Sequence, residues 1–173
     1  MSSVTKKLIL SIRRKALLIF VIFVFICQPL VVNGAEESIS LKNETITPGS
    51  FYFSFKRLWE KGMEKLQLTR DLRINFYKSQ LKIRLSELNY VVEKKLLGEV
   101  QQSTERFSYT AGKLTEELVM QNKPSEKEIV IKEFEKFQKY LDKLRDKYPA
   151  NSSFWMLVQH DINTLKILSD KLE

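Results

Sequence analysis

Residues 70–97 read RDLRINFYKSQLKIRLSELNYVVEKKLL, and their spacing indicates a long helix. The apolar side chains recur every three or four positions and form two stripes on roughly opposite faces. The first stripe comprises Ile74, Tyr77, Leu81, Leu85, Leu88, Val92 and Leu96. A helix with two apolar faces is either buried between neighbours or presents one face to a partner chain. The second stripe, which also includes Leu97, therefore gives candidate partner contacts at Leu72, Phe76, Ile83 and Tyr90.

The segments on either side of this helix predict four more helices. A helix starting near Ser50 has an apolar stripe, and two pairs, Glu60 with Glu64 and Lys61 with Lys65, are expected on its solvent side. The members of that stripe are Phe55, Leu58, Trp59, Met63 and Leu66. After Gly98, read as the C-cap of the 70–97 helix, the next helix covers 99–121 and ends at Asn122-Lys123-Pro124.

The C-terminal third predicts a helical hairpin. Ser125 and Glu128 have the spacing of a capping box, and Asn151 or Ser152 is expected to cap the last helix. Between them runs a coiled-coil-like seam formed by Val130, Phe134, Phe137, Leu141, Leu144 and Tyr148. We interpret this seam as a second surface for partner contact.

The fold class that follows is all-α. The 173 residues include only five Gly and four Pro, and no segment of residues 35–173 alternates with the period of two that a strand requires. We expect about five helices, packed as antiparallel hairpins or a small bundle.

The N-terminus indicates export. The five cations of residues 1–15 precede an apolar run from Ala16 to Cys27, which is the order found in a signal peptide. Cleavage before Ala35 is one interpretation, and an uncleaved membrane anchor from about Leu17 to Val32 is the other. Both place the rest of the chain outside the cytoplasmic membrane, either secreted or periplasmic, or anchored. The predicted organisation is a signal or anchor over 1–34, a polar linker over 35–49 and a helical domain over 50–173, divided at 122/123.

The net charge of +8 is unevenly distributed. Residues 1–34 hold five cations and no acid, so the exported part carries only +3. Its main basic excess lies between Ser50 and Gly98, where a cationic helix flank could bind anionic lipid, a wall polymer or nucleic acid. The candidate polyanion-binding residues are Arg70, Arg73, Lys78, Lys82 and Arg84. The aromatic residues nearby belong to the apolar stripes and not to the cationic flank, which favours an ordinary solvated flank over a binding surface. Nucleic acid is not an expected ligand.

Catalysis, metal binding and cofactor binding are not expected. The chain has one Cys and one His, which excludes an intramolecular disulfide and a thiolate zinc cluster. His160 falls away from the apolar stripe of its helix and is read as a surface residue. No phosphate-binding loop, nucleophile elbow or Glu-x-x-His pair occurs.

Two short motifs carry a resemblance. Residues 48–60 read PGSFYFSFKRLWE, and residues 84–88 read RLSEL. The chain resembles, over roughly Thr47 to Leu118, an uncharacterised bacterial family of exported helical domains that reads PGSPLYxLKRxxE, followed by a helix with RLxE. Phe51 and Phe53 depart from the Pro and Tyr usual there. The resemblance implies a helical fold, export and a bacterial source, and it assigns no catalytic residue.

The function expected from these observations is non-catalytic. We expect an exported or membrane-tethered helical domain that mediates protein–protein contact at the bacterial cell envelope, with another copy or an envelope protein as partner. The alternatives are a binder of anionic surfaces through the 70–84 flank, and an envelope-stress sensor or chaperone-like helical protein.

Overall fold

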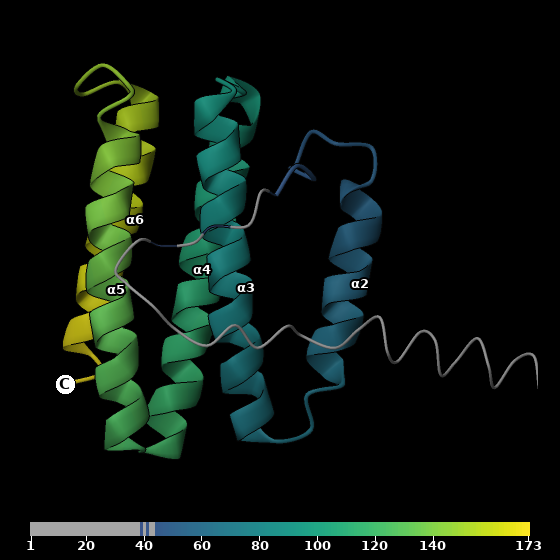
Figure 1. The fold of residues 1–173 in the computed structure, drawn as a ribbon, viewed down its shortest axis with the longest axis vertical. Helices are drawn as coiled ribbons and strands as arrows, with labels where there is room; N and C mark the ends of the chain where they lie inside the picture. The colour runs from purple at the N-terminus through teal and green to yellow at the C-terminus, as the bar shows by residue number, and fades with distance from the viewer. Residues whose placement is uncertain (1–38, 40, 42–43) are drawn as a thin grey trace, which may run out of the picture. The chain divides into compact units, whose positions relative to one another are not determined.

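The computed structural model describes residues 39, 41 and 44–173, which belong to one compact unit spanning 39–173. The described residues form five α-helices and no strand (Figure 1). The helices are α2 (Phe53–Lys65), α3 (Arg70–Glu93), α4 (Leu97–Gln121), α5 (Pro124–Arg145) and α6 (Ser153–Asp170). The prediction of an all-α fold with about five helices is confirmed. Within the described range no helix has the length and apolarity that a membrane span requires. The predicted signal or anchor lies outside that range.

Two antiparallel hairpins make up the body of the unit. α3 pairs with α4 and α5 pairs with α6, while α4 packs on α6 and α3 touches α5 more lightly (Figure 1). This arrangement is the one expected for up-and-down helices joined by short loops. α2 lies beside the hairpins and contributes a single buried side chain, Phe53.

The first apolar stripe of residues 70–97 lies in the core. Leu81, Leu85 and Leu88 are completely buried, and they pack with apolar side chains of all three other bundle helices. The second stripe is mixed. Leu72 is half-exposed, and Phe76 packs at the margin of the core. Ile83 and Tyr90 are partly buried.

The apolar seam of α5 is also internal. Five of its six side chains are buried, and Phe137 meets Phe107 of α4 with 6.5 Å between ring centroids. Tyr148 is partly buried. The interpretation of this seam as a partner surface is therefore wrong, because the chain's own helices cover it.

The break between α3 and α4 differs from the expected Gly98 cap. Lys95 adopts the left-handed conformation with φ 55°, and the Leu96 N–H donates to the Val91 carbonyl at 2.9 Å. The Lys95 N–H donates to the Val92 carbonyl at 3.1 Å, which completes a Schellman motif. Gly98 instead lies in the first turn of α4.

The predicted caps of the C-terminal hairpin have different outcomes. α5 begins at Pro124, whose missing N–H costs nothing in the first turn, and no side chain caps this end. Ser125 is thus inside the helix and the capping-box prediction is wrong. The Ser152 hydroxyl accepts from the Trp155 N–H at 3.2 Å, as expected for the cap of α6.

Part of the predicted linker lies on the helices. Ile39 and Leu41 pack against the hydrophobic core, and Thr47 is buried. Glu44 forms an ion pair with Lys56 of α2. The described residues of the 35–49 segment therefore belong to the helical unit.

Candidate functional site

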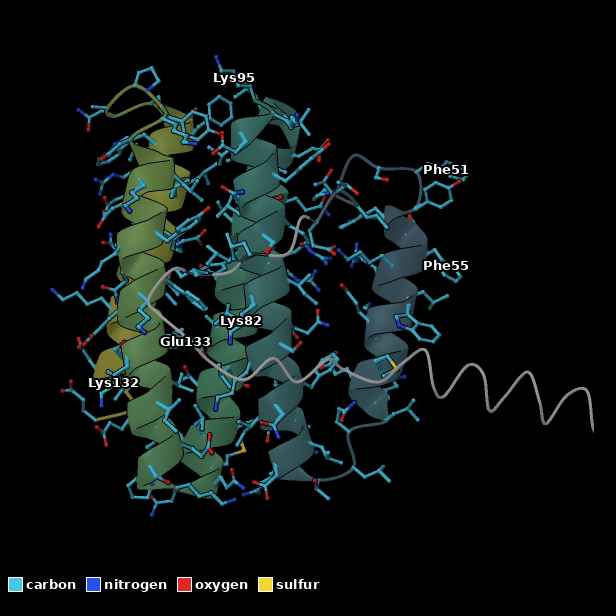
Figure 2. All side chains as sticks on the ribbon, viewed as in Figure 1. Phe51, Phe55, Lys82, Lys95, Lys132 and Glu133 are labelled. Atoms are coloured by element: carbon cyan, nitrogen blue, oxygen red, sulfur yellow. The ribbon has the colours of Figure 1, made fainter. Side chains whose placement is uncertain are left out.

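α2 presents its apolar side to solvent. Phe51 is 93% exposed, Phe55 and Leu58 are each 70% exposed, and Leu66 is 67% exposed. Figure 2 shows Phe51 and Phe55 directed away from α3 and α4. The prediction placed Phe55, Leu58 and Leu66 inward and Glu60 and Glu64 in solvent, and the structure reverses both. Lys61 and Lys65, which were also predicted to face solvent, are exposed. A Cβ at Gly62, on the same exposed side, would meet nothing within 4 Å.

The side of α2 that faces the bundle is polar. Glu60 Oε2 accepts from Arg84 Nη2 of α3 at 2.5 Å and from Arg106 Nη2 of α4 at 3.0 Å. One turn further on, Glu64 accepts from the Tyr77 hydroxyl at 2.6 Å. Charged and hydrogen-bonding groups thus hold α2 in place, and they explain why its acidic residues point inward.

Glu87 of α3 completes this network. Its side chain is fully buried, and its Oε1 lies 2.7 Å from Lys56 Nζ and 2.8 Å from Arg84 Nη1. Its Oε2 lies 3.6 Å from Arg106 Nε. We call Lys56, Glu60, Arg84, Glu87 and Arg106 the ionic clasp. With Glu44 bound to Lys56, it contains three cations and three anions.

The two sequence motifs meet at this clasp. Lys56 and Glu60 come from the PGSFYFSFKRLWE segment, and Arg84 and Glu87 come from RLSEL. Arg106 is supplied by α4, where its guanidinium also stacks over the Phe53 ring at 4.6 Å. Residues that are distant in sequence therefore build one buried ionic contact.

Burial makes the pairing within the clasp essential. Burial lowers the pKa of Arg84, but the hydrogen bond that Arg84 donates to Glu60 and the charge of Glu87 more than compensate and leave this pKa raised. The pKa of Arg106 is lowered by burial and by the neighbouring charge of Arg84. A buried charge that loses its partner is strongly destabilising, so the clasp constrains where α2 can lie.

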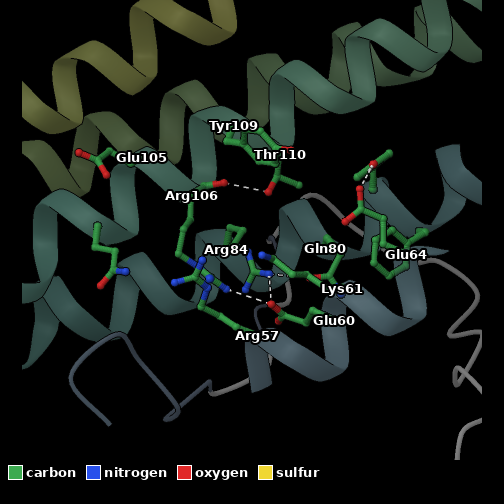
Figure 3. A pocket seen from close by; sticks show the side chains of 13 residues that line it. Arg57, Glu60, Lys61, Glu64, Gln80, Arg84, Glu105, Arg106, Tyr109 and Thr110 are labelled. Carbon is green, nitrogen blue, oxygen red and sulfur yellow. Dashed lines mark hydrogen bonds and ion pairs between the residues drawn. The ribbon is translucent and has the colours of Figure 1, made fainter. Parts of the chain in front are cut away.

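A pocket of about 520 Å³ lies between α2, α3 and α4, next to the clasp (Figure 3). Arg84 and Arg106 line it, and both already bond Glu60. Burial and hydrogen bonding to Glu64 raise the pKa of Tyr77, so this hydroxyl stays protonated near neutral pH. The pocket thus presents the paired charges of the clasp, the cations Arg57 and Lys61, and a neutral phenol.

The predicted polyanion-binding cations do not gather on one surface. Arg84 is buried in the clasp. Arg70 donates to the Met120 carbonyl at 2.8 Å, and Arg73 pairs with Glu117 of α4 at 2.9 Å. Lys78 pairs with Glu126 of α5 at 2.7 Å. Lys82 pairs with Glu133 of the same helix at 2.8 Å (Figure 2).

Asp161 is a buried carboxylate that sequence reasoning passed over in favour of its neighbour. His160 is exposed, as expected, whereas Asp161 is 1% exposed and its Oδ1 accepts from the Ser108 hydroxyl at 2.5 Å. Its Oδ2 has no hydrogen-bond partner. The described part of the chain contains no group of three or more His, Cys, Asp or Glu that could hold a metal ion.

Asp161→Asn is expected to stabilise the protein at pH 7. Burial raises the pKa of Asp161 well above its ordinary value, although Ser108 opposes this. Above about pH 4 the unfolded state releases the proton of this carboxyl group, whereas the folded state keeps it. The free energy of unfolding therefore falls as the pH rises from about 4 through the raised pKa of the folded state. Urea denaturation should show the variant more stable at pH 7 and equal to the parent below about pH 4. An advantage that is the same at both pH values would contradict this. Asp170→Asn, on the exposed side of α6, is the control.

The clasp was missed because its members are scattered in sequence. Arg84 and Glu87 are spaced i, i+3, which allows a pair on one helix, but this spacing does not reveal that the pair is buried. The apolar pattern of α2 carries no signal of its reversal, because the pattern is the same whichever face meets the bundle.

No protein-family model matches the chain, and comparisons with curated proteins and with solved structures also return no match. The family resemblance of residues 47–118 therefore stays a prediction. The candidate functional site rests on the geometry of α2 and the clasp.

Proposed function

We propose that this chain is a non-catalytic helical domain, exported or tethered at the bacterial cell envelope, that acts by contact through the exposed side of α2. The observation that carries the proposal is the orientation of α2. Phe55 and Leu58 are exposed while Glu60, on the same helix, is tied to two arginines. Clustered apolar side chains on a surface mark contact sites in soluble domains.

The ionic clasp supports this assignment. A helix attached through its polar side can keep its apolar side available, and the five charges specify that orientation. The α3–α6 body would serve as the rigid support. The second stripe of α3 and the α5 seam expose less apolar surface to a partner than α2 does. The stripe is mostly half-buried and the seam is internal.

Thiol accessibility tests the proposal. In a Cys27→Ser background, Phe55→Cys places a single thiol on the exposed side of α2, and Lys143→Cys places one on the exposed side of α5. Both should react freely in the purified full-length protein. In envelope fractions, residue 55 should be protected from a water-soluble maleimide while residue 143 stays reactive. Equal reactivity of the two thiols in the envelope would contradict contact through α2.

A further inference from the structure

The exposed apolar side of α2 is concentrated. Of the fifteen large hydrophobic residues exposed in the described part of the chain, seven lie between residues 51 and 68. We define the outward face of α2 as Phe51, Phe55, Leu58 and Leu66. α2 is also the most strongly amphipathic of the five helices. Its 13 residues form a rod of about 20 Å.

The charges around this face have one sign. Lys61 and Lys65 are exposed beside it, and they form no ion pair within the described residues. Arg57 is also exposed, but it lies toward the pocket between α2, α3 and α4, whose rim Lys61 shares. The acids of α2, Glu60 and Glu64, are turned toward the bundle and engaged there. The solvent side of α2 therefore combines apolar side chains with cations only.

This charge pattern distinguishes between two candidate partners for the outward face, a second copy of the chain and an anionic surface. A second copy docking through the same face would bring its own cations against Lys61 and Lys65, and like charges across an interface are unfavourable. An anionic surface complements them. An amphipathic helix with basic residues beside a Phe- and Leu-containing face is suited to the interface of an anionic bilayer.

The chain before the helices points to the same occupant. In the anchor interpretation the membrane segment continues past Gln28 and Pro29 to Val32, and only six residues separate Val32 from Ile39. A fully extended chain spans at most about 3.6 Å per residue. An apolar run held in a bilayer would thus leave the helical unit roughly 25 Å of chain or less from it.

We infer that the outward face of α2 docks into the interfacial layer of an anionic bilayer, with Lys61 and Lys65 against the lipid headgroups. The clasp holds the helix from the opposite side. This inference rests on the proposed contact function and names its partner as the lipid surface.

Environment-sensitive fluorescence tests the inference on the full chain. The Cys27→Ser/Phe55→Cys protein is labelled with a nitrobenzoxadiazole dye and reconstituted into vesicles of phosphatidylcholine alone or mixed with phosphatidylglycerol. In the mixed vesicles the emission at residue 55 should shift to the blue and brighten. Phosphatidylcholine alone should give a smaller shift, and added salt should reduce the response by screening the charges. The same dye at Lys143→Cys should report water in both.

Charge-reversal variants separate lipid docking from simple tethering. Lys61→Glu/Lys65→Glu should lose most of the blue shift at residue 55 in anionic vesicles. Lys139→Glu/Lys143→Glu is the matched control, because it reverses an exposed lysine pair with the same i, i+4 spacing on α5 and should keep the shift. Circular dichroism of each variant checks that the helices persist.

Three results would overturn the inference. These are equal shifts with and without anionic lipid, a lipid-independent shift that grows with protein concentration, and a water-like signal in all vesicles. The second result would identify another copy of the chain as the occupant. The third, combined with protection of residue 55 in the envelope, would leave the contact function standing and assign it to a protein partner. Loss of that protection would remove both proposals.

Discussion

Glu87→Gln is expected to destabilise the folded unit by about 3–5 kcal/mol, the range for a buried charge cluster that loses one partner. The Glu87 carboxylate is fully buried, and its Oε1 forms ion pairs with Lys56 Nζ at 2.7 Å and with Arg84 Nη1 at 2.8 Å. Glutamine keeps the shape of the side chain but removes its charge, which leaves three cations facing Glu44 and Glu60. Urea denaturation monitored by circular dichroism measures the loss.

An exposed pair provides the control for this variant. Glu116 pairs with Lys113 at the same i, i+3 spacing, but its side chain is 57% exposed. Glu116→Gln should change stability by less than about 0.5 kcal/mol, because solvent screens such pairs. If Glu87→Gln costs no more than Glu116→Gln, the clasp does not hold the fold.

A double variant tests whether charge balance is the cause. Arg84→Met combined with Glu87→Gln removes one cation and one anion, so the remaining clasp is again balanced. We expect this protein to regain part of the stability that Glu87→Gln loses, since neutral replacement of a buried pair is often tolerated. A double variant less stable than Glu87→Gln alone would show that Arg84 packing, and not charge, dominates.

Periodicity was sufficient for the helices and for most of the core. Leu81, Leu85 and Leu88 are buried as their spacing predicted, and the five helical segments are present. A 3.6-residue period depends only on neighbours along one helix. It can therefore be recognised without knowing how the helices pack together. The ends were less predictable, because Lys95 takes the left-handed cap position that was expected of a glycine.

The candidate site could not be predicted in the same way. Periodicity shows which residues share a face of α2, but not which face meets the bundle. That choice depends on Arg84 and Arg106, which lie 24 and 46 residues away from Glu60. The same limit applies to the cations of α3. In the sequence Lys78 and Lys82 have no evident acidic partner, but the fold places Glu126 and Glu133 of α5 beside them.

Phe53→Ala and Phe55→Ala are expected to differ greatly, although the two residues are only two positions apart on α2. Phe53 is 5% exposed and lies under the Arg106 guanidinium, whereas Phe55 is 70% exposed. Removing a buried Phe ring costs about 3–5 kcal/mol, from lost transfer free energy and a residual cavity. An exposed substitution usually stays within about 0.5 kcal/mol. Parallel denaturation of the two purified variants measures the difference.

The same pair separates folding from contact. If α2 had its apolar stripe inward, Phe55→Ala would be the damaging change and Phe53→Ala the mild one, so the order of the two effects alone reports the orientation. Phe55→Ala should keep the stability of the parent and yet weaken docking, because it removes apolar area from the outward face without touching the clasp. A stable Phe55→Ala protein with undiminished docking would move the contact surface elsewhere on the domain.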